Sequence, residues 1–334
     1  MKKKKSADFV FNLFFFGGKN KQKKKTKKKY KMSFEASLAN VNIFKKLIDC
    51  IKDLVKNLNL DISPTGLKMQ TMDSAHVCLV HTSMNKNFFE QFKCENVLCL
   101  GVNVLIMSKL LKCSGKDDTM TIKANSDSDR IKFIYESKDN LTISDFYMNL
   151  CEIDQDELQI PKMKHIAKIR MPSSQFKRIC NHMIEIGDSI TIKVEDGIAT
   201  FLVNGDSQEG SEVIRSRRGD KKKSKKKRKK KKKNDVEEEE DEEGVQYENS
   251  VEITCKSPFE NTFALKYLNF FSKGAILNEY VTLRFEHKCP MAIEFELGNE
   301  SYIHFYLSPM ISDIDQERDN IDSDDDDDSD GDEY

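Results

Sequence analysis

The sequence predicts an α+β protein built from two similar halves, and three observations support this prediction. Four segments carry apolar residues at spacings of three and four, which is the pattern of amphipathic helices. The segments between them alternate apolar and polar residues, as half-buried strands do. The order long helix, strands, short helix, strands then occurs twice, with a period of about 120–130 residues. We therefore expect largely antiparallel strands with all four helices on one side of them.

In the first half, the long helix is expected at Val41–Leu58, where Asn40 can cap its first turn. Alternation then runs from residue 60 to residue 80 and is broken by a turn, Ser-Pro-Thr-Gly, at residues 63–66. The short helix is expected at Asn103–Leu111. Three strands are predicted after it, at Thr119–Lys123, Arg130–Glu136 and Leu141–Leu150.

In the second half, a long helix is expected to begin at Ser173 or Ser174 and to bury Phe176, Ile179 and Met183. The short helix of this half is expected at Phe263–Ser272. Strands are predicted around these two helices at Ser189–Val194, Ile198–Val203, Ser211–Ile214, Val251–Cys255, Tyr280–Glu286, Met291–Glu296 and Tyr302–Leu307.

Charge is strongly segregated, although the 334 residues contain 55 Lys and Arg against 56 Asp and Glu. Residues 1–31 hold 13 Lys and one acidic residue, residues 215–243 hold 15 basic and nine acidic residues, and residues 313–334 hold 13 acidic residues and one Arg. Such segments have too few apolar residues to offset the entropy of ordering. The predicted organisation is a basic arm (1–31), a first domain (32–150), a connector (151–166), a second domain (167–312) with a disordered charged insertion (215–247), and an acidic tail (313–334).

Two of the charged segments allow more than one interpretation. Residues 1–31 are either a disordered arm or an upstream extension of the reading frame, with Met32 as the start. The lysine run at 221–233 is a nuclear localisation signal, a nucleic-acid contact or, together with the acidic run at 237–243, a self-neutralising loop.

The sequence argues against several classes of protein. No apolar run approaches the roughly 18 residues that a membrane-spanning helix needs. The nine cysteines include no CxxC pair, which indicates reduced thiols. The six histidines have no zinc-binding spacing, and Asp73-Ser74-Ala75-His76 lacks the further groups that a hydrolytic site requires. We therefore expect neither an enzyme nor a metal or other cofactor.

The outward faces of the four predicted helices are basic, although the remaining folded part of the chain is net acidic. These side chains are either solvated surface residues or parts of one positive surface for a polyanion. Contacts from such side chains to phosphates give affinity without reading base sequence. The residues concerned are Lys45, Lys46, Lys52, Lys56, Lys109, Lys112, Lys177, Arg178, Lys266 and Lys273.

Several motifs of the chain, such as Phe34-Glu35-Ala36, Gln70–Val77 and Tyr267–Phe271, occur together in one known family. By these motifs the chain resembles the proliferating cell nuclear antigens, which are the eukaryotic DNA sliding clamps. The similar segments run in order from residue 33 to about residue 314, and only the charged insertion interrupts them. They include Phe34-Glu35-Ala36, Gln70–Val77, Gly101–Asn103, Met107–Lys109, Met171–Ser173, Thr262–Leu265, Tyr267–Phe271 and Tyr306–Pro309.

This resemblance implies a homotrimeric ring around duplex DNA, with two similar domains per chain, helices lining the hole and sheets outside. The strands near Leu141–Leu150 of one subunit and Gln208–Arg215 of the next would abut. The ring would act in the nucleus as a DNA polymerase processivity factor and as a platform for replication and repair proteins. The implied DNA-binding residues are Lys45, Lys46, Lys52, Lys109, Lys112, Arg178 and Lys273.

Partners of the family dock short peptides that carry a glutamine and paired aromatic residues. The implied partners are the replicative DNA polymerase, the clamp loader, flap endonuclease and DNA ligase. The chain has no GxxxxGK[ST] motif with which to load itself. The matching peptide-binding positions are Met72, His76, Val77, Leu79, Leu158, Ile160, Pro290, Tyr306, Ser308 and Pro309.

The chain departs from the family pattern at several positions, which include Met310 and the acidic tail. Asn181 replaces a basic residue on the third helix, His165 replaces an aromatic residue, and Glu195 occupies the position of the lysine that carries ubiquitin. Two other functions remain open at this point: a subunit of a heteromeric, checkpoint-like ring, and a basic DNA-binding scaffold that acts through its charged arms alone.

Overall fold

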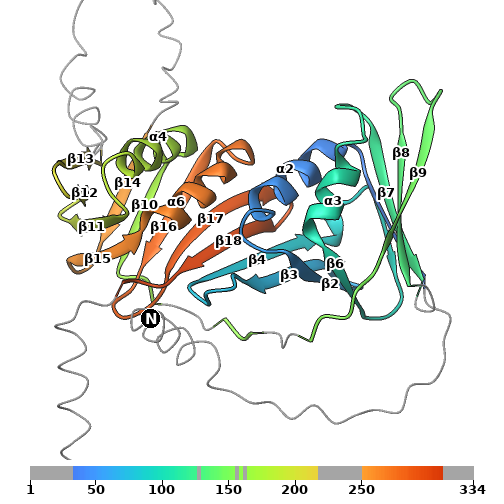
Figure 1. Cartoon of the computed structure of the whole chain (residues 1–334), viewed down its shortest axis with the longest axis horizontal. Coiled ribbons are helices and arrows are strands. Elements are labelled where there is room, and N and C mark those ends of the chain that lie inside the picture. The colour runs from blue at the N-terminus through green and yellow to red at the C-terminus, as the bar shows by residue number, and fades with distance from the viewer. Residues whose placement is uncertain (1–32, 126–128, 155–157, 161–163, 217–249, 311–334) are drawn as a thin grey trace, which may run out of the picture.

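The computed structural model describes residues 33–125, 129–154, 158–160, 164–216 and 250–310. The predictions for the arm at 1–31, for most of the charged insertion and for the acidic tail lie outside these residues. The described residues form a row of helices on one side of three antiparallel sheets (Figure 1). This is the α+β arrangement that the sequence predicts. Within the described ranges, no helix is both long enough and apolar enough to cross a membrane.

The described part of the first half contains two α-helices and nine strands, with one short 3₁₀ turn. In chain order they are β1 (Ser33–Leu38), α2 (Val41–Ile51), β2 (Asn57–Ser63), β3 (Gly66–Met72), β4 (Cys78–Asn85), η1 (Lys86–Phe88), β5 (Gln91–Cys94), β6 (Leu98–Asn103), α3 (Val104–Leu111), β7 (Thr119–Asn125), β8 (Arg130–Glu136) and β9 (Ile143–Asn149).

The described part of the second half has the same order of elements. In chain order they are β10 (Ala167–Pro172), α4 (Ser173–Ile184), β11 (Ser189–Glu195), β12 (Ile198–Asn204), β13 (Glu209–Arg215), β14 (Glu252–Cys255), β15 (Phe259–Ala264), α6 (Leu265–Phe271), the 3₁₀ turn η3 (Ser272–Ile276), β16 (Tyr280–Phe285), β17 (Met291–Gly298) and β18 (Ser301–Leu307).

Each half contributes two equivalent sheet units. The unit β5-β1-β7-β8-β9 of the first half corresponds to β14-β10-β16-β17-β18 of the second, and β6-β2-β3-β4 corresponds to β15-β11-β12-β13. Strand β18 pairs antiparallel with β4, so two units from different halves form one nine-stranded sheet. The corresponding edges, β9 and β13, have no neighbouring strand on their outer side within the described chain.

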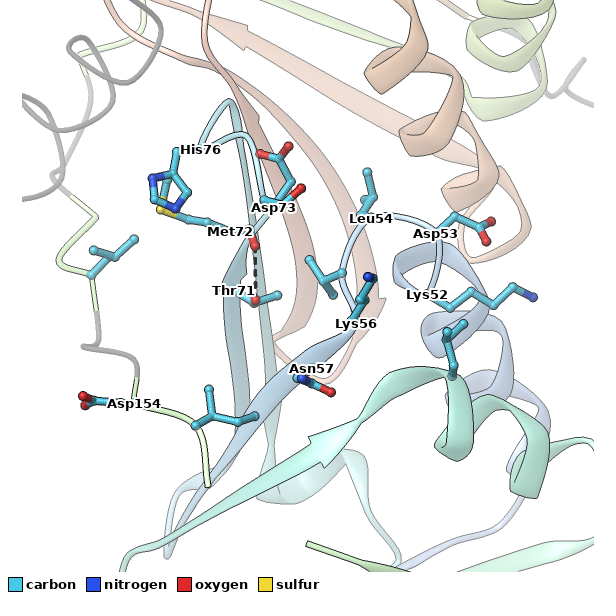
Figure 2. A pocket seen from close by; sticks show the side chains of 15 residues that line it. Lys52, Asp53, Leu54, Lys56, Asn57, Thr71, Met72, Asp73, His76 and Asp154 are labelled. Atoms are coloured by element: carbon cyan, nitrogen blue, oxygen red, sulfur yellow. Dashed lines mark hydrogen bonds between the residues drawn. The ribbon is translucent and has the colours of Figure 1, made fainter. Parts of the chain in front are cut away.

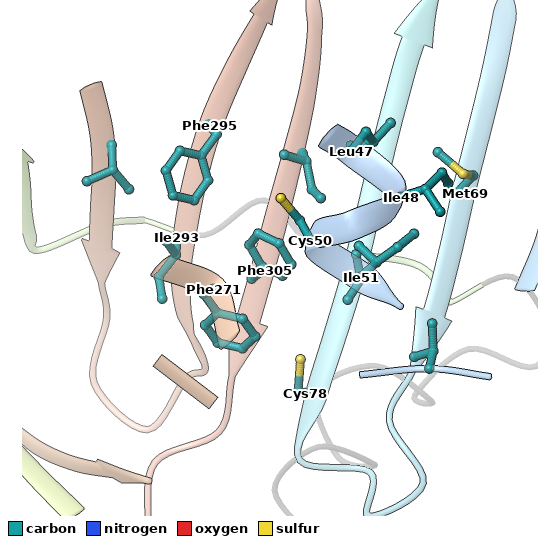
Figure 3. Packing of buried hydrophobic residues seen from close by; sticks show 14 of the residues in the cluster. Leu47, Ile48, Cys50, Ile51, Met69, Cys78, Phe271, Ile293, Phe295 and Phe305 are labelled. Carbon is teal, nitrogen blue, oxygen red and sulfur yellow. The ribbon is translucent and has the colours of Figure 1, made fainter. Parts of the chain in front are cut away.

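The helices pack on the sheets through one apolar cluster that spans both halves. Figure 3 shows Cys50 of α2 close to Phe305 of β18 at the junction of the halves. Phe271 of α6 stacks on Phe305, with 4.6 Å between the ring centroids. Both rings belong to the second half, and Cys50 of α2 in the first half is buried in the same cluster, so the core is continuous across the junction.

The helix ends differ from the prediction. Helix α2 ends at Ile51 rather than Leu58, and α6 begins at Leu265 rather than Phe263. Val55 and Leu58 are buried as their spacing suggests, but Leu58 lies in β2, not on the helix. The helical spacing of buried residues therefore continues past the end of α2 and into strand β2, which is why the helix was predicted too long.

Other predicted boundaries agree with the structure. Helix α4 begins at Ser173, one of the two expected starts, and Asn40 accepts a hydrogen bond from the Asn42 N–H at 2.7 Å as a cap. The alternation between residues 60 and 80 resolves into parts of β2, β3 and β4, with a turn at 63–66 between the first two strands. Strands β1, β5, β6, β10 and β15 were not predicted as separate elements.

Candidate DNA-facing surface and peptide-docking site

The basic residues predicted from the helices lie on α2, α3, α4 and α6 or just after their last residues, and they are exposed or partly exposed. Lys56 is the exception, because α2 ends before it and it lies in the loop that leads to β2. Helix α2 packs against α3 and α6, and α4 packs against α6, so the four helices form one row (Figure 1). On α4, Phe176 and Ile179 are buried while Lys177 and Arg178 are exposed. The same contrast on the other helices leaves a solvent-facing surface rich in lysine. Its predicted DNA-binding members are exposed at Lys109, Lys112 and Arg178 and partly exposed at Lys45, Lys46, Lys52 and Lys273.

Three of these seven residues have acidic partners. Lys52 contacts Asp49 at 2.7 Å, Lys273 contacts Asp53 at 2.5 Å, and Arg178 of α4 contacts Glu212 of β13 at 2.8 Å. Exposed ion pairs of this kind contribute little to stability, so the cations can exchange an acidic partner for a phosphate at small cost. The sequence alone did not indicate the Arg178–Glu212 pair, because its two residues lie in different elements, α4 and β13.

On the opposite face of the sheet, three of the predicted peptide-binding residues form a small buried apolar cluster with Ala292, and two more of them pack against its edge. Leu79, Leu158, Ala292 and Tyr306 are buried together, and Met72 and Ile160 pack against them. This cluster is separate from the main core and joins β4, β17 and β18 to the connector. We call it the connector cluster.

The remaining predicted peptide-binding residues surround this cluster less directly. Val77 packs on the main core, and its carbonyl accepts a hydrogen bond from the Ser308 N–H at 3.1 Å. Pro290, Ser308 and Pro309 are buried, whereas His76 is exposed with a positive φ of 54°. The structure therefore groups half of the ten predicted residues in one cluster and leaves the others around it.

Asp73 holds the turn that carries His76. Its carboxylate accepts hydrogen bonds from the backbone N–H groups of Ala75, Val77 and Cys78, at 3.1, 2.8 and 2.8 Å. It also accepts one from the Tyr267 hydroxyl of α6, at 2.7 Å, and this contact joins the two halves of the chain. Burial and the Asp73 charge raise the pKa of Tyr267, so its hydroxyl keeps the proton that it donates. Asp73 is thus committed to a structural role.

Two models of one protein family match the chain in succession. Residues 12–159 match the N-terminal domain of proliferating cell nuclear antigen, and residues 159–310 match its C-terminal domain. The chain belongs to the proliferating cell nuclear antigen family. It is therefore a DNA sliding clamp of two domains, and the family's role as a non-enzymatic scaffold agrees with the expectation that it is not an enzyme.

A hollow of about 960 Å³ adjoins the connector cluster of this clamp subunit. Figure 2 shows Met72 and His76 at the end of β3, Asp154 on the connector, and Lys52 and Asp53 beyond the end of α2. Met72 and Leu158 line the hollow and also belong to the connector cluster. Open space is therefore present beside the apolar residues that the family resemblance assigns to peptide docking.

The two free sheet edges of the subunit expose apolar side chains. Ile143 and Tyr147 of β9 are 65% and 55% exposed, and Val213 of β13 is 47% exposed. Leu141, in the turn before β9, is also exposed. These residues lie in the two segments that the resemblance predicted to abut between subunits.

Gln70 and Asp73 both lie in the family-like segment Gln70–Val77, but the prediction from sequence assigns no individual role to either residue. Asp73 had a local signal, because an Asp followed by a short polar turn often accepts hydrogen bonds from the next backbone N–H groups. Gln70 had no such signal, because its bonding partner Leu158 is 88 residues away in the sequence. Across the described residues, no group of three or more His, Cys, Asp or Glu side chains is placed to hold a metal ion.

Proposed function

We propose that the chain forms a homotrimeric ring that encircles duplex DNA in the nucleus, makes a DNA polymerase processive and docks replication and repair proteins. The clamp domains that we propose span residues 32–150 and 167–312, joined by the connector 151–166. One observation carries the proposal. The edge strands β18 and β4, which pair inside the chain, are equivalent to β9 and β13, which have no partner strand in the described chain.

The internal repeat supports the trimer. Strands β9 and β18 are equivalent in the two halves, as are β13 and β4. Because β18 pairs antiparallel with β4, β9 of one copy is expected to pair in the same way with β13 of a second copy. A head-to-tail contact of this kind closes into a ring, and closure satisfies backbone groups that a free edge leaves unpaired. Exposed Tyr147 and Val213 would be buried by this pairing.

The helix surface supports encirclement of DNA. A ring closed through the sheet edges would place the helix row on its inner side, where lysines meet phosphates. Such contacts are weak and independent of base sequence. Weak contacts are sufficient for a closed ring, because the ring is held on DNA by encircling it and can still slide along it.

The connector cluster supports peptide docking. Leu79, Leu158 and Tyr306 form an apolar surface between the sheet and the connector, with the hollow beside it. Such a site suits an aromatic anchor of a short partner peptide. The proposed partners are the replicative polymerase, the clamp loader, flap endonuclease and DNA ligase.

Retention on circular DNA tests the proposal. The full chain is loaded by a cognate clamp loader and ATP onto nicked circular duplex, and the DNA is then linearised by a restriction enzyme. We expect trimers that stay on the circle, leave after linearisation and lengthen the products of a cognate polymerase. Equal retention on circular and linear DNA would support a basic scaffold instead. A native mass spectrum that shows a second type of subunit in the assembly would support a heteromeric ring.

A further inference from the structure

A row of polar and small residues crosses the outer face of the nine-stranded sheet. Asn59 of β2 lies directly opposite Gly101 of β6 on one side and Gln70 of β3 on the other. The row continues through His81 of β4 to His304 of β18. Because neighbouring residues on these strands, such as Leu60 and Met69, face the main core, the row faces away from the helices.

The connector follows the first three members of this row. The Cys151 N–H donates to the Gly101 carbonyl at 2.9 Å, and the Asn59 side-chain amide donates to the Ile153 carbonyl at 3.5 Å. A Cβ atom on residue 101 would lie 2.1 Å from the Cys151 carbonyl oxygen, so only glycine allows the connector to approach there. The contacts at Gly101 and Asn59 thus fix the start of the connector.

Gln70 holds the connector at its centre through two hydrogen bonds to a single residue. Its side-chain N–H donates to the Leu158 carbonyl at 2.8 Å, and the Leu158 N–H donates to its side-chain oxygen at 2.7 Å. The amide therefore pairs with the connector backbone as a neighbouring strand would. Gln70 is 9% exposed, so water competes weakly for these bonds.

The two bonds orient the Leu158 side chain. With its backbone fixed over β3, Leu158 is 6% exposed and packs on Leu79 and Tyr306 in the connector cluster. Within the described residues 158–160, Leu158 is the one fully buried residue of the connector. The shape of the proposed docking surface thus depends on one side-chain amide.

We propose that Gln70 is the positioning residue of the docking site: it pins the connector at Leu158 and so prepares the apolar surface before a partner peptide binds. This inference rests on the proposed peptide-docking function. A peptide that meets a pinned connector does not have to order it, and affinity rises because that entropic cost was met on folding. Gln70 itself need not touch the peptide.

The Gln70→Met variant tests the inference. Methionine keeps a similar size but can make neither hydrogen bond. We expect a fluorescent peptide with one glutamine and two aromatic residues to bind this variant about tenfold more weakly, by anisotropy, than the unaltered chain. We also expect faster amide exchange at Leu158, with the oligomeric state unchanged. The matched control is Lys68→Met, two residues away on the same strand, where the side chain is exposed.

The Gln70→Glu variant separates positioning from a general loss of packing. An ionised Glu can accept from the Leu158 N–H but repels the Leu158 carbonyl, whereas a protonated Glu can make both bonds. Burial raises the pKa of such a carboxyl above its ordinary value of roughly 4.3. We therefore expect weak peptide binding at pH 7.5 and recovery to within about twofold of the unaltered chain at pH 5.5.

The unaltered chain gives the baseline for the comparison between pH 7.5 and pH 5.5, because the next member of the row, His81, does not titrate between these values in that chain. In the unaltered chain, burial lowers the pKa of His81 to about 4, with a smaller effect from the Lys68 charge, so His81 stays neutral at pH 5.5 there. The peptide contains no His, Asp or Glu, and the unaltered chain and Lys68→Met are measured at both pH values.

The outcomes distinguish this inference from the proposed function. If the unaltered chain does not bind the peptide, the docking function is wrong. If it binds but Gln70→Met binds equally well, or Gln70→Glu shows no recovery at pH 5.5, the positioning role of Gln70 is wrong. Weaker binding by Gln70→Met with normal exchange at Leu158 would also contradict it.

Discussion

Replacing Tyr147 by serine should disrupt the proposed ring without unfolding the subunit. Tyr147 lies on the free edge strand β9 and is 55% exposed in the single chain. A tyrosine presents roughly 200 Å² of surface, so about 110 Å² becomes available for burial when β9 meets β13 of a second copy. At about 25 cal/mol per Å² the upper limit is near 2.8 kcal/mol, and incomplete burial reduces it to about 2 kcal/mol per junction.

A trimer contains three such junctions, so Tyr147→Ser should weaken the ring by about 6 kcal/mol in total. This corresponds to roughly 10⁴-fold in the three-body dissociation constant. Because the concentration at half assembly varies as the square root of that constant, it should rise on the order of 100-fold. Sedimentation velocity over a wide concentration range measures this shift directly.

The subunit itself should tolerate the change. In the single chain the Tyr147 ring contacts Lys132, with the ammonium 5.4 Å from the ring centroid, and Lys132 keeps its 2.7 Å contact with Asp145 in the variant. The control is Val97→Ser, because Val97 is 70% exposed in the turn between β5 and β6, outside strands β9 and β13. Equal assembly of Tyr147→Ser and the unaltered chain would refute the β9–β13 junction.

Three further results are expected. The double variant Lys109→Glu, Lys112→Glu should bind duplex DNA more weakly and lower the slope of log affinity against log salt by about two, as measured by anisotropy; an unchanged slope would exclude these lysines from the DNA contact. Asp73→Ala leaves the Tyr267 hydroxyl and three backbone N–H groups without their acceptor, and should cost about 3 kcal/mol, seen as a lower denaturant midpoint. Burial lowers the pKa of His81 to about 4 and of His304 to about 3, so unfolding takes up protons below about pH 6.5 and stability falls as the pH falls from 6.5 towards 4. Changing both histidines to glutamine should flatten that fall in denaturant midpoints measured at pH 7 and pH 5, and an equally steep fall would show that other groups cause it.

Local patterns allowed most of the fold to be predicted. The buried face of α4 and the limits of strand β8 follow from the spacing of apolar residues that are close in the sequence, and both predictions agree with the structure. The end of α2 did not follow, because Leu58 continues the helical spacing but is buried by pairing with Val102 of β6. A distant strand, not a local signal, ends the apparent helix.

The site was less accessible to sequence reasoning than the fold. Tyr306 and Leu79 lie directly opposite each other across the β18–β4 junction, but 227 residues separate them in the chain, so only the family resemblance could bring them together. Gln70 belongs to the matching segment, yet its burial and its two bonds to Leu158 depend on the path of the connector. No period or spacing encodes that path.

The path of the connector also explains why the repeat does not double the docking site. The β18–β4 junction inside each chain and the proposed β9–β13 junction between chains are equivalent in sheet topology. The connector leaves β9 at Cys151 and crosses β6, β2 and β3 to reach Leu158, on the face that carries Tyr306. A second connector of this kind would have to follow β18, the equivalent of β9, and none lies among the residues that the structure describes there. The proposed ring therefore has six similar sheet junctions and docking sites at only three of them, which gives one partner peptide per chain.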